Sequence, residues 1–262
     1  ELGMKMMGAM DVEDWYDVYG RLTHWTLELE KSEDDSMQEV LSMQFEDANR
    51  QFGKFIEKNY QAWISSGDEE NMPVVPILSH RVLPQFLPEA MQSAQGRQVF
   101  LVVIDNLRLD QWRAIEPMLS DLFTVVKDDK YMSILPTATQ YARNALFSGL
   151  LPADIKRLYP DWWIHEDAEG SKNKFEEQLL LELLKRLGID GRTSYHKVAN
   201  LATGRKLLDQ FHETKGEILT TVVYNFVDML SHARTDMEVI KELADDEAAY
   251  RSLTLTWFEH SA

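Results

Sequence analysis

The stretch Val99-Phe100-Leu101-Val102-Val103-Ile104-Asp105 decides the fold class of this 262-residue chain. Six apolar residues in a row, with no polar alternation, are typical of a strand that is covered on both faces, as in a parallel sheet. A second run of this kind, Glu217–Phe226, ends just before Asp228. We therefore predict an α/β domain from residue 97 onward, built on these two buried strands.

The remaining elements of this domain follow from periodicity and from helix stop signals. Shorter apolar runs predict two further strands, at Phe123–Val126 and Tyr131–Ile134. Apolar residues at helical spacing predict three helices, over Thr139–Gly149, Phe175–Leu187 and Met237–Trp257. Gly188 is the expected stop signal of the second of these helices, because glycine readily takes the left-handed conformation that ends a helix.

Residues 1–66 predict a small helical bundle in front of the α/β domain. Two amphipathic patterns run through Val12–Leu29 and Met37–Trp63, separated by acids and hydroxyls. Ser36 is the expected cap of the second helix, with Glu39 completing a capping box. Both helices have an apolar face that needs a partner, either the rest of the chain or a second copy. Residues 67–96 contain four prolines, which predict an ordered connector without a long helix.

Composition narrows the possible functions. The chain has 44% hydrophobic residues and a formal net charge of −17, which indicates a globular protein and disfavours nonspecific binding of polyanions. It contains no cysteine, so a metal site must use Asp, Glu, His or hydroxyl ligands. No apolar run approaches the roughly 18 residues of a membrane helix. We expect a cytoplasmic protein that does not act at a membrane.

Asp105 and Asp228 follow the two predicted buried strands, and His232 lies four residues after Asp228. Ligands of open α/β sheets bind beyond the carboxyl ends of the strands. Read singly, Asp105 fits a helix cap and His232 a structural histidine. Read together at two strand ends, the three residues favour a divalent metal site.

The segment Leu135-Pro136-Thr137-Ala138-Thr139 places two threonines at the start of a predicted helix. Threonine is an ordinary helix cap. A hydroxyl at the positive end of a helix is also suited to a phosphate ligand, and a bound metal would make it a nucleophile. Spacing alone leaves both interpretations open.

Three segments resemble the motifs of PglZ domains, which are members of the alkaline phosphatase superfamily. Val102–Asp110 resembles the opening motif, Leu135–Gly149 the nucleophile segment, and Tyr224–His232 the central metal motif. They occur in the order and spacing of that family. The helical front and the connector resemble those of response regulators that carry a C-terminal PglZ domain and are associated with type IX secretion.

This resemblance implies a fold and a set of roles. The α/β part would be an incomplete alkaline-phosphatase-like sheet flanked by helices, with residues 97–262 as the N-terminal part of a PglZ domain. Asp105 and Thr139 would bind one zinc ion, with Thr139 rather than Thr137 as the nucleophile, and Asp228 and His232 would bind a second. Arg108 and Arg143 belong to the matching segments, with no role assigned to either.

The family has further histidine and Asp-His ligands downstream of His232, and a receiver domain in front of the linker. Here the only later histidine is His260, and no Asp-His pair follows. We therefore expect an internal fragment of a longer protein. With about two ligands for each metal, the fragment should bind zinc poorly and be nearly inactive.

The leading hypothesis is a zinc-dependent phosphodiesterase effector domain of a two-component response regulator, acting on nucleotide or oligonucleotide phosphodiesters. The expected partners are a second copy in a homodimer and a sensor histidine kinase that acts on the receiver domain. The alternative is a non-catalytic regulatory interaction module of the same signalling protein, for which the amphipathic front helices argue.

Overall fold

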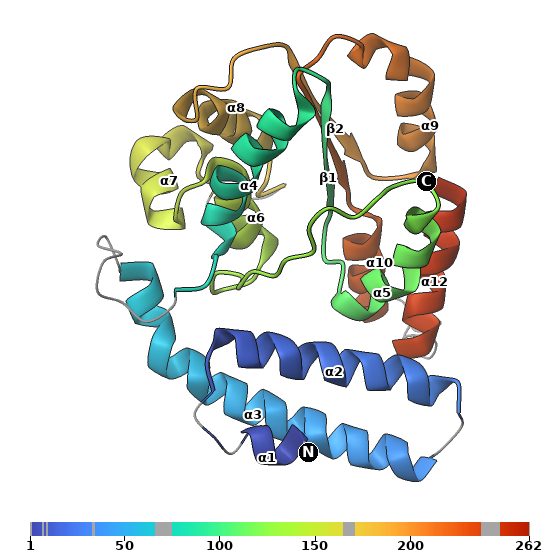
Figure 1. The fold of residues 1–262 in the computed structure, drawn as a ribbon. Coiled ribbons are helices and arrows are strands. Elements are labelled where there is room, and N and C mark those ends of the chain that lie inside the picture. The colour runs from blue at the N-terminus through green and yellow to red at the C-terminus, as the bar shows by residue number, and fades with distance from the viewer. Residues whose placement is uncertain are drawn as a thin grey trace. The chain divides into compact units, whose positions relative to one another are not determined.

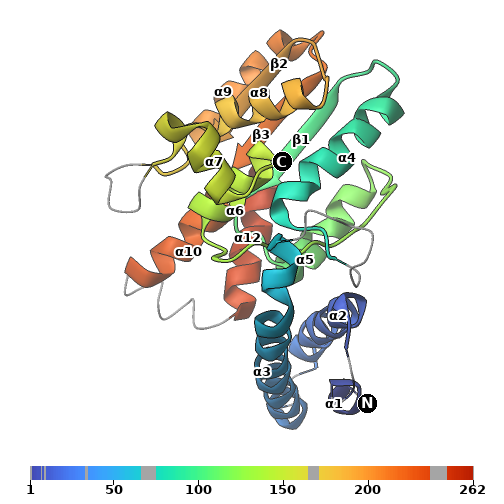
Figure 2. The same ribbon diagram turned by 90° about the vertical axis from the view of Figure 1, so that its left-hand side faces the viewer.

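The structure is a computed structural model that describes residues 2–6, 8, 10–32, 35–65, 75–164, 171–236 and 247–261. Its contacts divide the chain into two compact units. Unit 1 comprises residues 1–76, 107–128 and 231–262, and unit 2 comprises residues 77–106 and 129–230. Figures 1 and 2 show the elements in two orthogonal views. No described helix is both long and apolar enough to span a bilayer.

Unit 2 is built on a parallel sheet, which confirms the predicted α/β class. Within the described residues the sheet has three strands in the order β1-β3-β2, with β1 at Val99–Ile104, β3 at Leu219–Tyr224 and β2 at Thr193–Val198. Val99 pairs with Leu219, and Ile104 with Tyr224. The two long apolar runs are therefore adjacent strands, with β3 in the centre. β3 is buried as predicted, but Phe100 and Val102 of β1 are exposed, so the prediction that β1 is covered on both faces was wrong. The sequence TSYHKV of β2 lacks such a run, and the strand was not predicted.

Helices cover one face of this sheet and create the core of unit 2. Figure 1 shows α4, α6, α7 and α8 on one side of the strands and α9 on the other. α6 (Thr139–Ser148) and α8 (Glu176–Arg186) confirm two predicted helices. Phe147 and Leu183 are buried with Leu219 and Val223 of the central strand. The other elements are α7 (Pro152–Leu158), η2 (Pro160–Trp162), α9 (Leu201–Gln210) and η3 (Phe211–Thr214).

The expected proline-rich connector contains a helix, so the prediction that prolines exclude one there was wrong. α4 spans Ser79–Ala94 and includes both Pro84 and Pro88. A proline inside a helix costs about 3 kcal/mol, because it removes a hydrogen bond and crowds the preceding turn. The spacing of Leu83 and Leu87 puts both on one face, and both are buried in the core of unit 2. Tertiary burial of that face offsets the local cost.

Two predicted strands are absent from the described structure. Phe123–Val126 forms no regular element, and its residues are exposed. Tyr131–Ile134 contributes only an isolated bridge between Met132 and Leu78. An apolar run becomes a strand only when another strand supplies hydrogen-bond partners along its length, and no described segment pairs with either run in this way.

Unit 1 contains the predicted amphipathic helices. α1 spans Leu2–Met6, α2 spans Val12–Glu30 and α3 spans Asp35–Ser65. Figure 1 shows α2 and α3 running side by side. Trp15 of α2 packs edge-on against Phe52 of α3, with ring centroids 5.2 Å apart. α3 begins before Ser36, so this serine lies in the first turn and the prediction that it caps the helix was wrong.

The other elements of unit 1 come from later in the chain. α5 (Leu109–Ser120) packs beside α12 (Glu247–Ser261), and the buried Gln111 amide donates to the Thr254 hydroxyl at 2.9 Å. α10 spans Phe226–Asp236 and passes from unit 2 into unit 1. Of the helix predicted over Met237–Trp257, residues 237–246 lie outside the described residues, and the rest belongs to α12.

Candidate functional site

The parallel strands bring two predicted acids to the same edge of the sheet. Asp105 directly follows β1, and Asp228 lies in the first turn of α10, just beyond β3. The backbone N–H of Asp105 donates to the carbonyl of Tyr224 at 2.9 Å, which continues the β1–β3 pairing up to this acid. Both residues are partly buried. This is the edge at which open α/β sheets bind their ligands.

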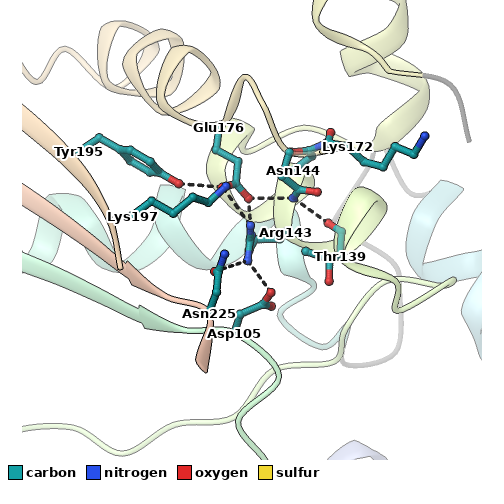
Figure 3. Close-up of polar contacts among 10 residues, drawn as sticks. Asp105, Thr139, Arg143, Asn144, Lys172, Glu176, Tyr195, Lys197 and Asn225 are labelled. Carbon is teal, nitrogen blue, oxygen red and sulfur yellow. Dashed lines mark hydrogen bonds and ion pairs between the residues drawn. The ribbon is translucent and has the colours of Figure 1, made fainter. Parts of the chain in front are cut away.

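A buried arginine, Arg143 of α6, reaches this edge. Its Nη1 atom forms an ion pair with Asp105 Oδ2 and also donates to Asn225 Oδ1 at 3.2 Å. Figure 3 shows the guanidinium between these two residues and Glu176. The Arg143 side chain is 7% exposed. A cation buried to this degree needs paired carboxylates, and the structure supplies two of them.

Glu176, the first residue of α8, holds the other side of the guanidinium. Its Oε1 atom accepts from Arg143 Nε, and its Oε2 atom accepts from Arg143 Nη2 at 3.1 Å. The Tyr195 hydroxyl donates to Oε2 at 2.7 Å, and Lys197 Nζ lies 3.2 Å from the same atom. The Glu176 side chain is 1% exposed. Such a two-point contact fixes both the position and the plane of the guanidinium.

Burial and the charge of Arg143 shift the pKa of Asp105 in opposite directions. Burial raises the pKa of Asp105 above its ordinary value, Arg143 opposes this rise, and the negative charges of Asp228 and Glu176 add to it. Although burial disfavours the charged guanidinium, Glu176 and Asp105 keep the pKa of Arg143 above its ordinary value. Asp228 is thus close enough to Asp105 for its negative charge to act on that carboxylate. A cation placed beside both would relieve that repulsion.

Thr139 begins α6, one helical turn before Arg143. The N-cap residue is Ala138, which makes no side-chain hydrogen bond, so neither threonine serves as the cap. Thr137 precedes the helix and is exposed, whereas Thr139 is partly buried. Asn173 Nδ2 donates both to the Thr139 carbonyl at 3.1 Å and to Glu176 Oε1 at 2.8 Å. One amide therefore links the start of α6 to the carboxylate that holds Arg143.

Comparison with known families identifies the family of the chain. Residues 83–256, well over half of the chain, match the family model of the PglZ alkaline phosphatase-like domain of BREX systems. The chain belongs to the PglZ family. Residues 1–64 match the model of the linker domain of PorX response regulators, as the predicted helical front implied. No curated protein matches the chain.

The donor chemistry of this PglZ site suits a divalent metal in part. Asp105 and Asp228 supply carboxylates at one sheet edge, and Thr139 supplies a hydroxyl at the start of α6. Oxygen atoms of this kind are accepted ligands of zinc and other divalent cations. Within the described residues, no three acidic or histidine side chains converge closely enough to hold an ion. A metal bound here would therefore need further donors.

Two other residues of the matching motifs belong to unit 1. His232 is on α10, one turn beyond Asp228, but it belongs to unit 1 and is exposed. Arg108 also belongs to unit 1, where Nη2 donates to Asp110 at 2.9 Å and the guanidinium lies 5.1 Å from the ring centroid of Tyr250. The contacts of Arg108 thus join α5 to α12.

Sequence reasoning missed the residues that surround Arg143. Glu176 lies in the first turn of a helix, where an acidic residue is common because it stabilises the helix N-terminus. Its position in the sequence therefore gives no indication that it contacts a distant arginine. Tyr195 and Lys197 alternate along β2, a strand that was not predicted. Finding β2 would have placed these two side chains on the same face of the sheet.

Proposed function

We propose that this chain carries the hydrolytic part of a metal-dependent phosphodiesterase with Thr139 as nucleophile and zinc as the metal. Membership of an alkaline phosphatase-like family supports hydrolysis of phosphate esters. The observation that carries the proposal is the position of Asp105 and Asp228 beyond the carboxyl ends of β1 and β3, with Arg143 paired to Asp105. Such a mixture of carboxylates and a fixed cation suits a site for a metal and a phosphate together.

We assign to Thr139 the role of the nucleophile that attacks a phosphodiester. Its backbone is at the positive end of α6, which favours a bound phosphate. A divalent metal, when bound, supplies the Lewis acidity that lowers the pKa of a hydroxyl and offsets phosphate charge. The Thr139 oxygen forms a bond to phosphorus as the ester oxygen leaves. The threonine loses its proton and the departing alcohol gains one. Water then cleaves the phosphothreonine to release a phosphomonoester and restore Thr139.

The substrate class of the proposal is a nucleotide or oligonucleotide phosphodiester. A net charge of −17 repels such a polyanion at long range. Arg143 and Lys197 place two positive charges behind the site, although Glu176 offsets part of their field. We therefore expect weak affinity for long nucleic acids and a preference for small substrates whose charge a bound metal can neutralise.

The linker match supports placing this activity in a signalling protein. We propose that the chain belongs to a PorX-like response regulator of the type IX secretion system. A sensor histidine kinase would act on its receiver domain, and the protein would form a homodimer in the cytoplasm. The described front helices already bury an aromatic cluster around Trp15, Phe52 and Phe55. This cluster gives the linker a core of its own.

The test combines metal content with hydrolysis of bis-p-nitrophenyl phosphate by the complete protein and by this 262-residue chain. We expect bound zinc and ester cleavage by the complete protein, loss of cleavage in Thr139→Ala with zinc retained in large part, and loss of both in Asp105→Asn. An Arg157→Gln variant, altered at an exposed salt bridge of unit 2, should match the wild type. A complete protein that lacks both zinc and activity would refute the proposal.

A second candidate function is a regulatory interaction module without catalysis. The observation that favours it is the absence of three converging ligands among the described residues. Signalling that survives Thr139→Ala in the complete protein, while ester cleavage is lost, would support this role. Loss of both would support the enzyme.

A further inference from the structure

The contact between Arg143 and Asp105 has a one-sided geometry. Only Nη1 of the guanidinium faces the site, where it contacts Asp105 Oδ2 and Asn225 Oδ1. Nε and Nη2 face away and are both taken by Glu176. Figure 3 shows this division, with Glu176 on one side of Arg143 and the two sheet-edge residues on the other. The arginine is thus fixed from behind and presents one donor group to the site.

We propose that Arg143 is a positioning residue, which Glu176 fixes in place and which orients the Asp105 carboxylate for binding of a divalent cation. This inference rests on the proposed function, because it assumes that Asp105 binds the metal. Arg143 contacts one carboxylate oxygen and leaves the other untouched. Groups that hydrogen-bond a metal ligand from behind fix its orientation, and removing them costs about 10- to 100-fold in metal affinity.

The charge of Arg143 must be weighed against this benefit, since a lone positive charge would repel a cation. Glu176 makes two contacts with the guanidinium and offsets its charge, so that Arg143, Lys197 and Glu176 together carry one positive charge instead of two. Lys197 and Tyr195 in turn hold Glu176, and Asn173 adds a third donor. Four groups from α8, β2 and the segment before α8 therefore hold the Arg143 side chain in place. Because so many groups hold Arg143 in place, we favour a role in orienting Asp105 over one in which its positive charge competes with the metal.

Charge and orientation predict opposite results for Arg143→Gln. This variant removes the positive charge and leaves the Glu176 carboxylate, so a purely electrostatic effect would tighten binding of a cation. Loss of orientation would weaken it. Arg143→Lys keeps the charge but removes the fork of donors, so the electrostatic effect predicts no change and the positioning effect predicts weaker binding.

The experiment measures the zinc dissociation constant of the complete protein by competition with a fluorescent chelator, alongside the melting temperature of the metal-free form. We expect both Arg143→Lys and Arg143→Gln to weaken binding by about 10- to 100-fold. Arg157→Gln, in the same unit but at an exposed ion pair, is the matched control and should bind as the wild type does. Affinity is compared only among variants that remain folded.

Because Arg143 is buried, its variants can unfold, and Asn225→Ala gives a milder test. This change removes one acceptor of Nη1 and leaves the Glu176 contacts in place, so we expect a smaller loss of zinc affinity. Unchanged affinity in every folded Arg143 and Asn225 variant, or tighter binding in Arg143→Gln, would overturn the inference. If zinc binding by the wild type is absent or does not depend on Asp105, the proposed function fails first, and the inference fails with it.

Discussion

Arg251 of α12 donates to the Asp110 carboxylate of α5 at 2.6 Å and also pairs with Glu30 at the end of α2. Glu30 lies in the part that matches the PorX linker, and the other two residues lie in the part that matches PglZ. The Arg251 side chain is 6% exposed. Unit 1 therefore joins linker and PglZ residues through a buried ion pair.

This arrangement predicts unequal effects of removing its members. Arg251→Met leaves the mostly buried Asp110 without one of its partners and should destabilise the protein by about 3 kcal/mol. Glu30→Gln removes the more exposed partner and should cost less than about 1 kcal/mol. Urea denaturation followed by circular dichroism measures both. Equal losses in the two variants would contradict the assignment of Arg251 as the central residue.

Gly149 ends α6 with a φ angle of 63°, and a Cβ atom there would lie 2.8 Å from Leu183 Cδ1. Gly96 also has a positive φ angle, of 81°, but has open space around it. Gly96→Ala should cost about 1 kcal/mol from backbone strain alone. Gly149→Ala should cost about 1–3 kcal/mol more, since it also overpacks the core. Comparing urea midpoints of the two variants separates strain from crowding, and equal midpoints would refute the predicted clash.

The buried side chain of His80 should make the folded protein less stable in acid. Burial lowers the pKa of His80 to about 4, and its buried Nδ1 atom has no hydrogen-bond partner in the described structure. The folded state therefore binds a proton less readily than the unfolded state, whose histidine titrates near 6.5. The contribution of His80 to stability is complete above about pH 6.5 and falls as the pH drops towards 4.

Melting temperatures between pH 7.5 and pH 5 test this dependence. His80→Gln should lose less stability than the wild type over that interval. His212→Gln, altered at an exposed histidine, should follow the wild type. Parallel curves for the wild type and His80→Gln would show that His80 does not govern the acid response.

The choice between the two threonines can be tested directly. Thr139 is the first residue of α6 and is one turn from Arg143, whereas Thr137 is exposed before the helix. In the complete protein, Thr139→Ala should reduce hydrolysis of bis-p-nitrophenyl phosphate by at least about 100-fold, because it removes the attacking oxygen. Thr137→Ala should retain most activity, and Thr139→Ser should retain part of it. Loss of activity in Thr137→Ala alone would assign the nucleophile to Thr137.

Local sequence was sufficient to predict a helix or strand where a single feature, such as an apolar run or a helix-ending glycine, was strong. The apolar runs identified the strands β1 and β3, although only β3 is buried as predicted, and Gly149 and Gly188 marked the ends of α6 and α8. Local signals misled where tertiary contacts decided the outcome. α4 forms despite Pro84 and Pro88 because Leu83 and Leu87 are buried. Phe123–Val126 is not a strand because no strand in the described part of the chain pairs with it.

The candidate site shows the same division between what local sequence predicts and what tertiary contacts decide. The sequence by itself determined that Asp105 directly follows one strand, that Asp228 lies shortly beyond another and that Thr139 starts a helix, since each property depends on neighbours within a few residues. Only the tertiary structure decided that Arg143 joins Asp105 to Glu176, because these partners lie 38 and 33 residues away along the chain. An ion pair of this kind depends on how β1, α6 and α8 pack, and the spacing of residues in a single segment carries no record of that packing.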